Sequence, residues 1–119
     1  MEIEYASGKC RKKCAQLANI YHMASKKGNT CKDRSACLYA KIISLLSACN
    51  DFNAVMKIPT FKLMRGHMLK GNLQGKWAFD MVHPQRFIFE LIGAQRLNDG
   101  SFDYSTVKKV RIYDIVDYH

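Results

Sequence analysis

The chain of 119 residues lacks the features that mark membrane and secreted proteins. It has no apolar run near the roughly 20 residues needed to cross a bilayer. Its first residues, MEIEYASGKCRKK, contain no apolar segment of the kind found in a secretory signal. Internal repeats, low-complexity stretches and linkers are also missing. We therefore expect one cytoplasmic domain spanning residues 1–119, with no membrane partner.

Patterns typical of metal sites are missing as well. The five cysteines all lie in the first half, none is part of a C-x-x-C motif, and none is paired with histidine at a zinc-site spacing. Cys10 and Cys14 are one helical turn apart, but no second pair completes a site. No cluster of carboxylates suggests two-metal chemistry. We expect no metal and no cofactor, and we interpret the cysteines as free thiols that pack as small apolar groups.

Acidic residues are scarce, with 10 Asp and Glu against 19 Lys and Arg, so the net charge is +9. Between Phe52 and Phe79 there is no acid at all. This stretch carries several basic residues: Lys57, Lys62, Arg65, Lys70 and Lys76. The balance favours a polyanionic partner, with Lys62, Arg65 and Lys76 as candidate phosphate contacts. The alternative is an ordinary solvated basic face.

Helical periodicity dominates the first half of the chain. Apolar residues share one face over residues 8–27, and Gly28 follows as a stop signal. A second helix is predicted to open with Thr30 as its N-cap and to end near Asn50. A third, short helix is predicted over residues 51–56, before Pro59.

Strand patterns dominate the second half. Alternating or β-rich segments cover residues 60–66, 75–82, 86–92 and 109–116, and a further short strand is predicted at residues 2–5. The sequence therefore predicts the α+β class, with two to three N-terminal helices packed on one face of a small, mostly antiparallel, twisted sheet.

Two segments carry candidate chemistry. His67 opens HMLKGNLQGKW, a basic stretch punctuated by glycines. The chain closes on VDYH, which supplies Asp117, Tyr118 and His119. In a strand Asp117 and His119 face one way and Tyr118 the other, although this alternation relaxes at a strand end. Alternatively, the first segment is an ordinary turn and the second a polar tail.

These groups suit RNA cleavage through the ribose 2′-hydroxyl. A base takes the proton of the 2′-hydroxyl, the oxygen attacks the adjacent phosphate, and an acid protonates the leaving 5′-oxygen. Histidine titrates near neutral pH and can serve in both roles. Lys70 and Arg86 could neutralise the charge that builds on the phosphate. This route needs no metal.

The segments LMRGHMLKGNLQGKW and RFIFEL and the terminal VDYH resemble, in this order, the HigB-like branch of the RelE/ParE toxin superfamily. The resemblance covers about residues 62–119. It implies a RelE-like fold and a ribosome-dependent mRNA endonuclease, the toxin of a type II toxin–antitoxin pair. On the matching positions His67, Asp117, Tyr118 and His119 would be catalytic. Lys70 and Arg86 would bind the scissile phosphate.

The resemblance also implies partners. These are mRNA and the decoding site of the 30S ribosomal subunit, and a HigA-like helix-turn-helix antitoxin, through which alone the toxin would reach operator DNA. Two other functions stay open. One is a ParE-like, non-enzymatic toxin that binds gyrase, and the other is a basic RNA-binding module without activity.

Overall fold

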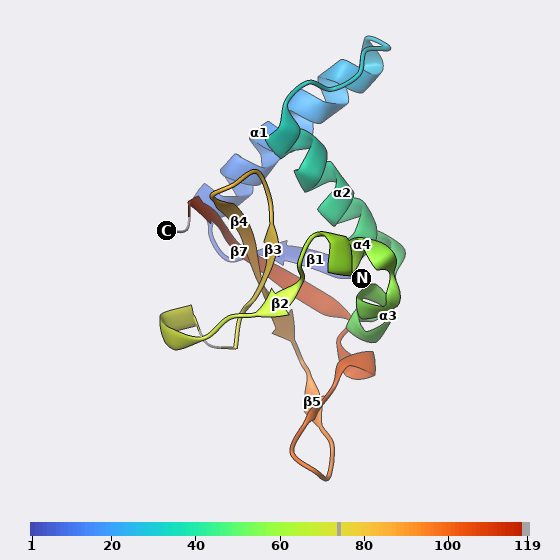
Figure 1. Ribbon diagram of the computed structural model, residues 1–119, viewed down its shortest axis with the longest axis vertical. Helices are drawn as coiled ribbons and strands as arrows, with labels where there is room; N and C mark the ends of the chain where they lie inside the picture. Colours follow the sequence, from blue (N-terminus) through green and yellow to red (C-terminus); the bar gives the residue numbers. More distant parts are fainter. Residues whose placement is uncertain (74, 118–119) are drawn as a thin grey trace.

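A computed structural model describes residues 1–73 and 75–117 and has the expected α+β architecture (Figure 1). The helices are α1 (Gly8–Lys26), α2 (Arg34–Ala48), α3 (Phe52–Lys57) and α4 (Pro59–Leu63), with 3₁₀ turns η1 (Gly71–Leu73) and η2 (Tyr104–Thr106). The strands are β1 (Glu2–Tyr5), β2 (His67–Met68), β3 (Trp77–Asp80), β4 (Gln85–Ile92), β5 (Gln95–Arg96), β6 (Phe102–Asp103) and β7 (Lys109–Asp117). The described part of the chain thus has four α-helices, against the two to three expected.

Five strands form one sheet in the order β1-β7-β4-β3-β2. Neighbouring strands run antiparallel, apart from β1, which pairs in parallel with β7. The predicted, mostly antiparallel sheet is therefore confirmed. Strands β5 and β6 form a separate two-stranded ribbon that extends away from the sheet (Figure 1).

Short polar side chains fix where the helices begin. Ser7 accepts a hydrogen bond from the Cys10 amide at 3.0 Å and caps α1. Asp33 caps α2 in the same way through the Ala36 amide at 2.9 Å. The predicted N-cap at Thr30 is therefore wrong. Asp33, three residues later, is the cap instead.

The prediction of a strand over residues 60–66 is also wrong. Pro59 occupies the first turn of α4, where its fixed φ suits a helix and its missing N–H costs nothing. The helix has only five residues, which is too short to display a helical period in the sequence. It ends in a Schellman motif, in which the Gly66 amide donates to Phe61 O (2.9 Å) and the Arg65 amide to Lys62 O (3.0 Å).

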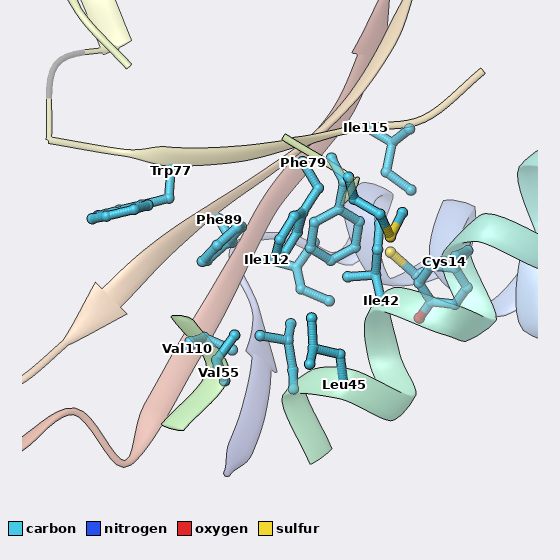
Figure 2. Close-up of a cluster of buried hydrophobic side chains, with 14 of the residues drawn as sticks. Cys14, Ile42, Leu45, Val55, Trp77, Phe79, Phe89, Val110, Ile112 and Ile115 are labelled. Carbon is cyan, nitrogen blue, oxygen red and sulfur yellow. The ribbon is translucent and has the colours of Figure 1, made fainter. Parts of the chain in front are cut away.

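The main core lies between the helices and one face of the sheet. Figure 2 shows Cys14, Ile42, Leu45 and Val55 from the helices against side chains of the strands. The strands contribute alternate residues to this layer: Trp77 and Phe79, Phe87 and Phe89, and Val110 and Ile112. We call this side of the sheet the helix face. Because successive side chains of a strand alternate, the residues between these core positions point to the opposite side.

Candidate nucleic-acid interface

The opposite side of the sheet, which we call the far face, holds Arg86, one of the predicted phosphate-binding residues. Alternation along β3 and β4 puts Ala78 and Ile88 there, in a small buried cluster with Leu69 from the segment after β2. Asp80 and Arg86 are cross-strand partners next to this cluster. The charged residues of the far face therefore stand on a rigid, paired part of the sheet.

Asp80 holds two arginines together at this place. Its Oδ1 lies 3.4 Å from Arg86 Nε, and its Oδ2 lies 3.5 Å from Arg65 Nε. The Arg65 side chain is 77% exposed, whereas the Arg86 side chain is 29% exposed. Two guanidinium groups against one carboxylate leave a net positive charge. This geometry suits a phosphate, which guanidinium groups bind with paired hydrogen bonds.

The backbone of Arg65 is in the left-handed region, with φ of 55°. It occupies the C′ position of α4, where glycine is the usual residue. A side chain costs about 1 kcal/mol in this conformation. Gly66, the next residue, has no room for a side chain, because an added Cβ would lie 2.4 Å from the Phe61 ring. The turn thus has a strained arginine beside a required glycine.

His67 follows this turn as the first residue of β2 and pairs with Ala78. Its Nδ1 lies 2.6 Å from the carbonyl oxygen of Arg65. A carbonyl oxygen only accepts hydrogen bonds, so Nδ1 carries the proton in this contact. In the neutral ring Nε2 then holds the lone pair. The half-buried ring lines a hollow of about 460 Å³ together with Lys62, Arg65 and Phe61.

Asp117 lies elsewhere. It ends β7 opposite Gln85, on the side of the sheet that α1 covers. There it lines an open hollow of about 510 Å³ with Lys13 and Leu17 of α1. Tyr118 and His119, the other two residues of the predicted catalytic end, lie outside the described residues.

The register of the sheet gives the separation of His67 from Asp117. His67 is aligned with Ala78, Ile88 and Asp114 on the successive strands β3, β4 and β7. Asp117 is three strands across and three residues along, or roughly 17 Å away between Cα atoms. The structure therefore does not bring these two side chains together. A joint site of His67 with Tyr118 and His119 stays a prediction.

The three predicted lysines occupy different places. Lys62 is exposed on α4 and lines the same hollow as His67. Lys76 lies over the ring of Tyr113, with Nζ 4.7 Å from the ring centroid. Lys70 is exposed just before η1. An aromatic ring among cations is a common feature of surfaces that bind single-stranded nucleic acid.

Two features of the structure were not predicted from the sequence. One is Asp80, which holds Arg65 and Arg86 in place. The other is the charge of the α1–α2 hairpin, since residues 8–48 contain nine Lys and Arg and one acid, Asp33, a net of +8. A count of charge by segment would have found the second. The position of Asp80 beside Arg86 can be found only from the register of β3 with β4.

Within the described residues, no group of three or more His, Cys, Asp or Glu side chains could hold a metal ion. None of the helices described is long and apolar enough to cross a membrane. Comparison of the chain with family models, with curated proteins and with solved structures found no match.

Proposed function

We propose that this protein is an endoribonuclease that cleaves mRNA by attack of the ribose 2′-hydroxyl, without a metal ion. In this proposal it is a HigB-like toxin with a RelE-like fold that acts at the decoding site of the cytoplasmic ribosome. The single observation that carries the proposal is the setting of His67. Its Nδ1 is engaged by the Arg65 carbonyl, and its ring shares a hollow with the cations Lys62 and Arg65.

This setting supports proton transfer through one defined atom. With the proton held on Nδ1, the ring gains or gives a proton at Nε2. The Arg65 carbonyl would stabilise the charged imidazolium as well, because Nδ1 donates to it in both states. His119 is the proposed second proton-transfer residue, and Asp117 and Tyr118 are the proposed groups that orient or assist it.

The arginine pair supports the second requirement of the reaction. Attack by the 2′-oxygen adds negative charge to the non-bridging phosphate oxygens. Arg65 and Arg86, held at one carboxylate, are cations placed before the substrate arrives. Lys70 and Lys76 would extend this positive surface along an RNA strand.

The charge distribution supports a large polyanion as the target. Residues 8–48, which form most of the α1–α2 hairpin, carry a net charge of +8. In the proposal this hairpin contacts ribosomal RNA while the far face takes mRNA. A HigA-like antitoxin with an acidic surface would neutralise these cations, and operator DNA would be reached only through that complex.

A second function, a basic RNA-binding module without activity, is favoured by one observation. The separation of roughly 17 Å between His67 and Asp117 leaves these two residues unable to act on one atom together. The two functions differ in their products, since a binding module leaves RNA intact.

The chemistry of the products tests the proposal. The purified chain is incubated with ribosomes and a short, end-labelled mRNA, with EDTA added after complex assembly in one arm. We expect fragments that end in a 2′,3′-cyclic phosphate or 3′-phosphate and that form in EDTA. Fragments that end in 3′-hydroxyl would overturn the 2′-hydroxyl mechanism, and intact RNA would favour the binding module.

A further inference from the structure

Two of the five cysteines lie close together where the loop after α1 enters α2. Cys31 is in the loop, and Cys37 is in the first turns of the helix. The Cys37 thiol donates to the carbonyl oxygen of Cys31, with Sγ and O 3.2 Å apart. Disulfides join residues whose Cα atoms are about 4.4–6.8 Å apart. The Cys37 sulfur therefore lies directly beside the backbone of Cys31, and a disulfide needs such closeness.

Both thiols are accessible. Each residue is half-buried, and the two line one open hollow of about 520 Å³ between the end of α1 and the start of α2. Tyr21 and Lys41 form other parts of its wall. A small polar molecule can therefore reach the sulfur atoms from solvent.

The other three cysteines are in a different environment. Cys10, Cys14 and Cys49 have only 2%, 1% and 7% of their surface exposed. Burial raises the pKa of Cys14 to about 12 and also raises the pKa of Cys10. Since the thiolate is the reactive form, Cys10 and Cys14 should resist oxidants, and burial shields Cys49 from solvent. The chain thus contains its own unreactive controls.

From this geometry we propose that Cys31 and Cys37 form a dithiol site that hydroperoxides oxidise to an intramolecular disulfide. The disulfide fastens the loop to the first turns of α2. Cys10, Cys14 and Cys49 stay reduced under the same conditions. This inference goes beyond the proposed function and does not rest on it.

The oxidation has two steps. The Cys31 thiolate attacks one oxygen of hydrogen peroxide, the O–O bond breaks, and Cys31 becomes a sulfenic acid as hydroxide leaves. The Cys37 sulfur then attacks the Cys31 sulfur, an S–S bond forms, the S–O bond breaks, and the proton of Cys37 leaves with the hydroxide as water. The dithiol loses two electrons and two protons, and peroxide becomes two molecules of water.

Cys31 is assigned the first step for a physical reason. A hydrogen bond with the Cys31 thiol and partial burial raise the pKa of Cys37, to which Asp33 also contributes. Cys37 is thus held as a protonated thiol that donates to Cys31 O, and it suits the resolving role. In a reducing compartment such a bond is transient and responds to oxidant.

Peptide mapping tests the proposal. The full chain is treated with hydrogen peroxide, its remaining thiols are trapped by alkylation in denaturant, and it is digested with trypsin without reductant. Trypsin places Cys31 in the peptide of residues 28–32 and Cys37 in that of residues 35–41. We expect these two peptides to appear as one cross-linked species. The count of free thiols should fall from five to three.

Variants separate this outcome from others. Cys31→Ser and Cys37→Ser should each abolish the cross-linked species, whereas Cys49→Ser should leave it intact. Five free thiols after treatment would overturn the proposal. So would a link from either residue to Cys10, Cys14 or Cys49, or a dimer joined through Cys31. Circular dichroism of each serine variant checks that the fold is retained.

Discussion

At the scale of single residues, Arg65 shows a conflict between backbone and side chain. Its φ of 55° suits glycine, yet the residue is an arginine beside Asp80 and His67. Strain of this kind persists where a side chain is needed for another purpose. The exposed ion pair with Asp80 is a weak reason to keep it, because such pairs contribute little to stability. The proposed binding of a phosphate is the stronger reason.

The change Arg65→Gly tests this interpretation. We expect the free energy of unfolding to rise by about 1 kcal/mol, because the left-handed backbone is no longer strained. Affinity for a single-stranded RNA should fall, because the variant has no guanidinium group to bind a phosphate at this position. Urea denaturation and a filter-binding assay measure the two quantities. Stability that falls, or RNA affinity that is unchanged, would contradict the interpretation.

At the scale of elements, the short helix α3 anchors the core through Phe52. This residue is fully buried and makes edge-on ring contacts with Trp77 at 5.0 Å and with Phe89 and Tyr104 at 5.9 Å between centroids. It therefore connects the helical half of the chain to β3, β4 and η2. Removal of this ring should therefore destabilise the packing of the helices and of the strands at the same time.

Replacing this ring with a methyl group gives a direct measurement. Phe52→Ala should lower the free energy of unfolding by about 3–5 kcal/mol, the range for removing a buried aromatic side chain. Phe102→Ala is the matched control, since Phe102 lies on the β5–β6 ribbon with 36% of its surface exposed. Urea denaturation of both variants gives the two losses. Equal losses would contradict the anchoring role of Phe52.

The parallel edge strand β1 gives a pH-dependent contribution. A side-chain hydrogen bond from Arg111 on β7 lowers the pKa of Glu4 below its ordinary 4.5. A lowered folded-state pKa means that the stabilisation is complete above about pH 4.5 and is lost as the pH falls through the lower value. Unfolding at a series of pH values should show this loss, and Glu4→Gln should reduce it. The role of the ion pair would be contradicted if the free energy of unfolding fell equally at low pH in the wild type and in Glu4→Gln.

Most elements could be predicted from the sequence, because long periodic segments carry a strong signal. The helix over residues 8–27 and the strands around Phe79, Phe87 and Ile112 were predicted correctly. The segment 60–66 was not, because five residues of helix cannot establish a period and Phe61 and Leu63 also fit a strand. The parallel pairing of β1 with β7 depends on contacts between the two ends of the chain, which local patterns do not record.

The site could be predicted less fully than the fold. Residue types identified His67 and Arg86 as candidates, and their roles stay predictions. The distance between His67 and Asp117 could not be predicted, because it depends on strand order and register.

At the scale of the whole molecule, part of the positive charge lies at the far end of the α1–α2 hairpin. Lys26 and Lys27 end α1, far along the hairpin from the sheet (Figure 1). By contrast, Lys108 and Lys109 are placed against Asp51, Glu2 and Glu4. Their charge is locally balanced, so the two pairs of lysines should differ in their attraction for RNA.

Neutralising each pair separates local charge from net charge. The double change Lys26→Gln with Lys27→Gln should weaken binding to ribosomes and make it less dependent on salt. The slope of the logarithm of the binding constant against the logarithm of the salt concentration should become shallower by about 0.7–0.9 for each phosphate that is no longer neutralised. The double change Lys108→Gln with Lys109→Gln alters net charge equally and should have the smaller effect. Titrations over a range of salt concentrations measure both. Equal effects would mean that net charge alone governs binding.

The central claim, that His67 and the end of the chain cut mRNA on the ribosome, is tested most directly by mapping 5′ ends. Ribosomes programmed with a defined mRNA are treated with the wild-type chain, with His67→Ala, with His119→Ala and with His22→Ala, the last being an exposed histidine on α1. Primer extension, with and without ribosomes, locates each cut. We expect cuts at the decoding site with the wild type and His22→Ala, and their loss in the other two variants. Intact mRNA in every arm, or cuts that persist in both His67→Ala and His119→Ala, would contradict the claim.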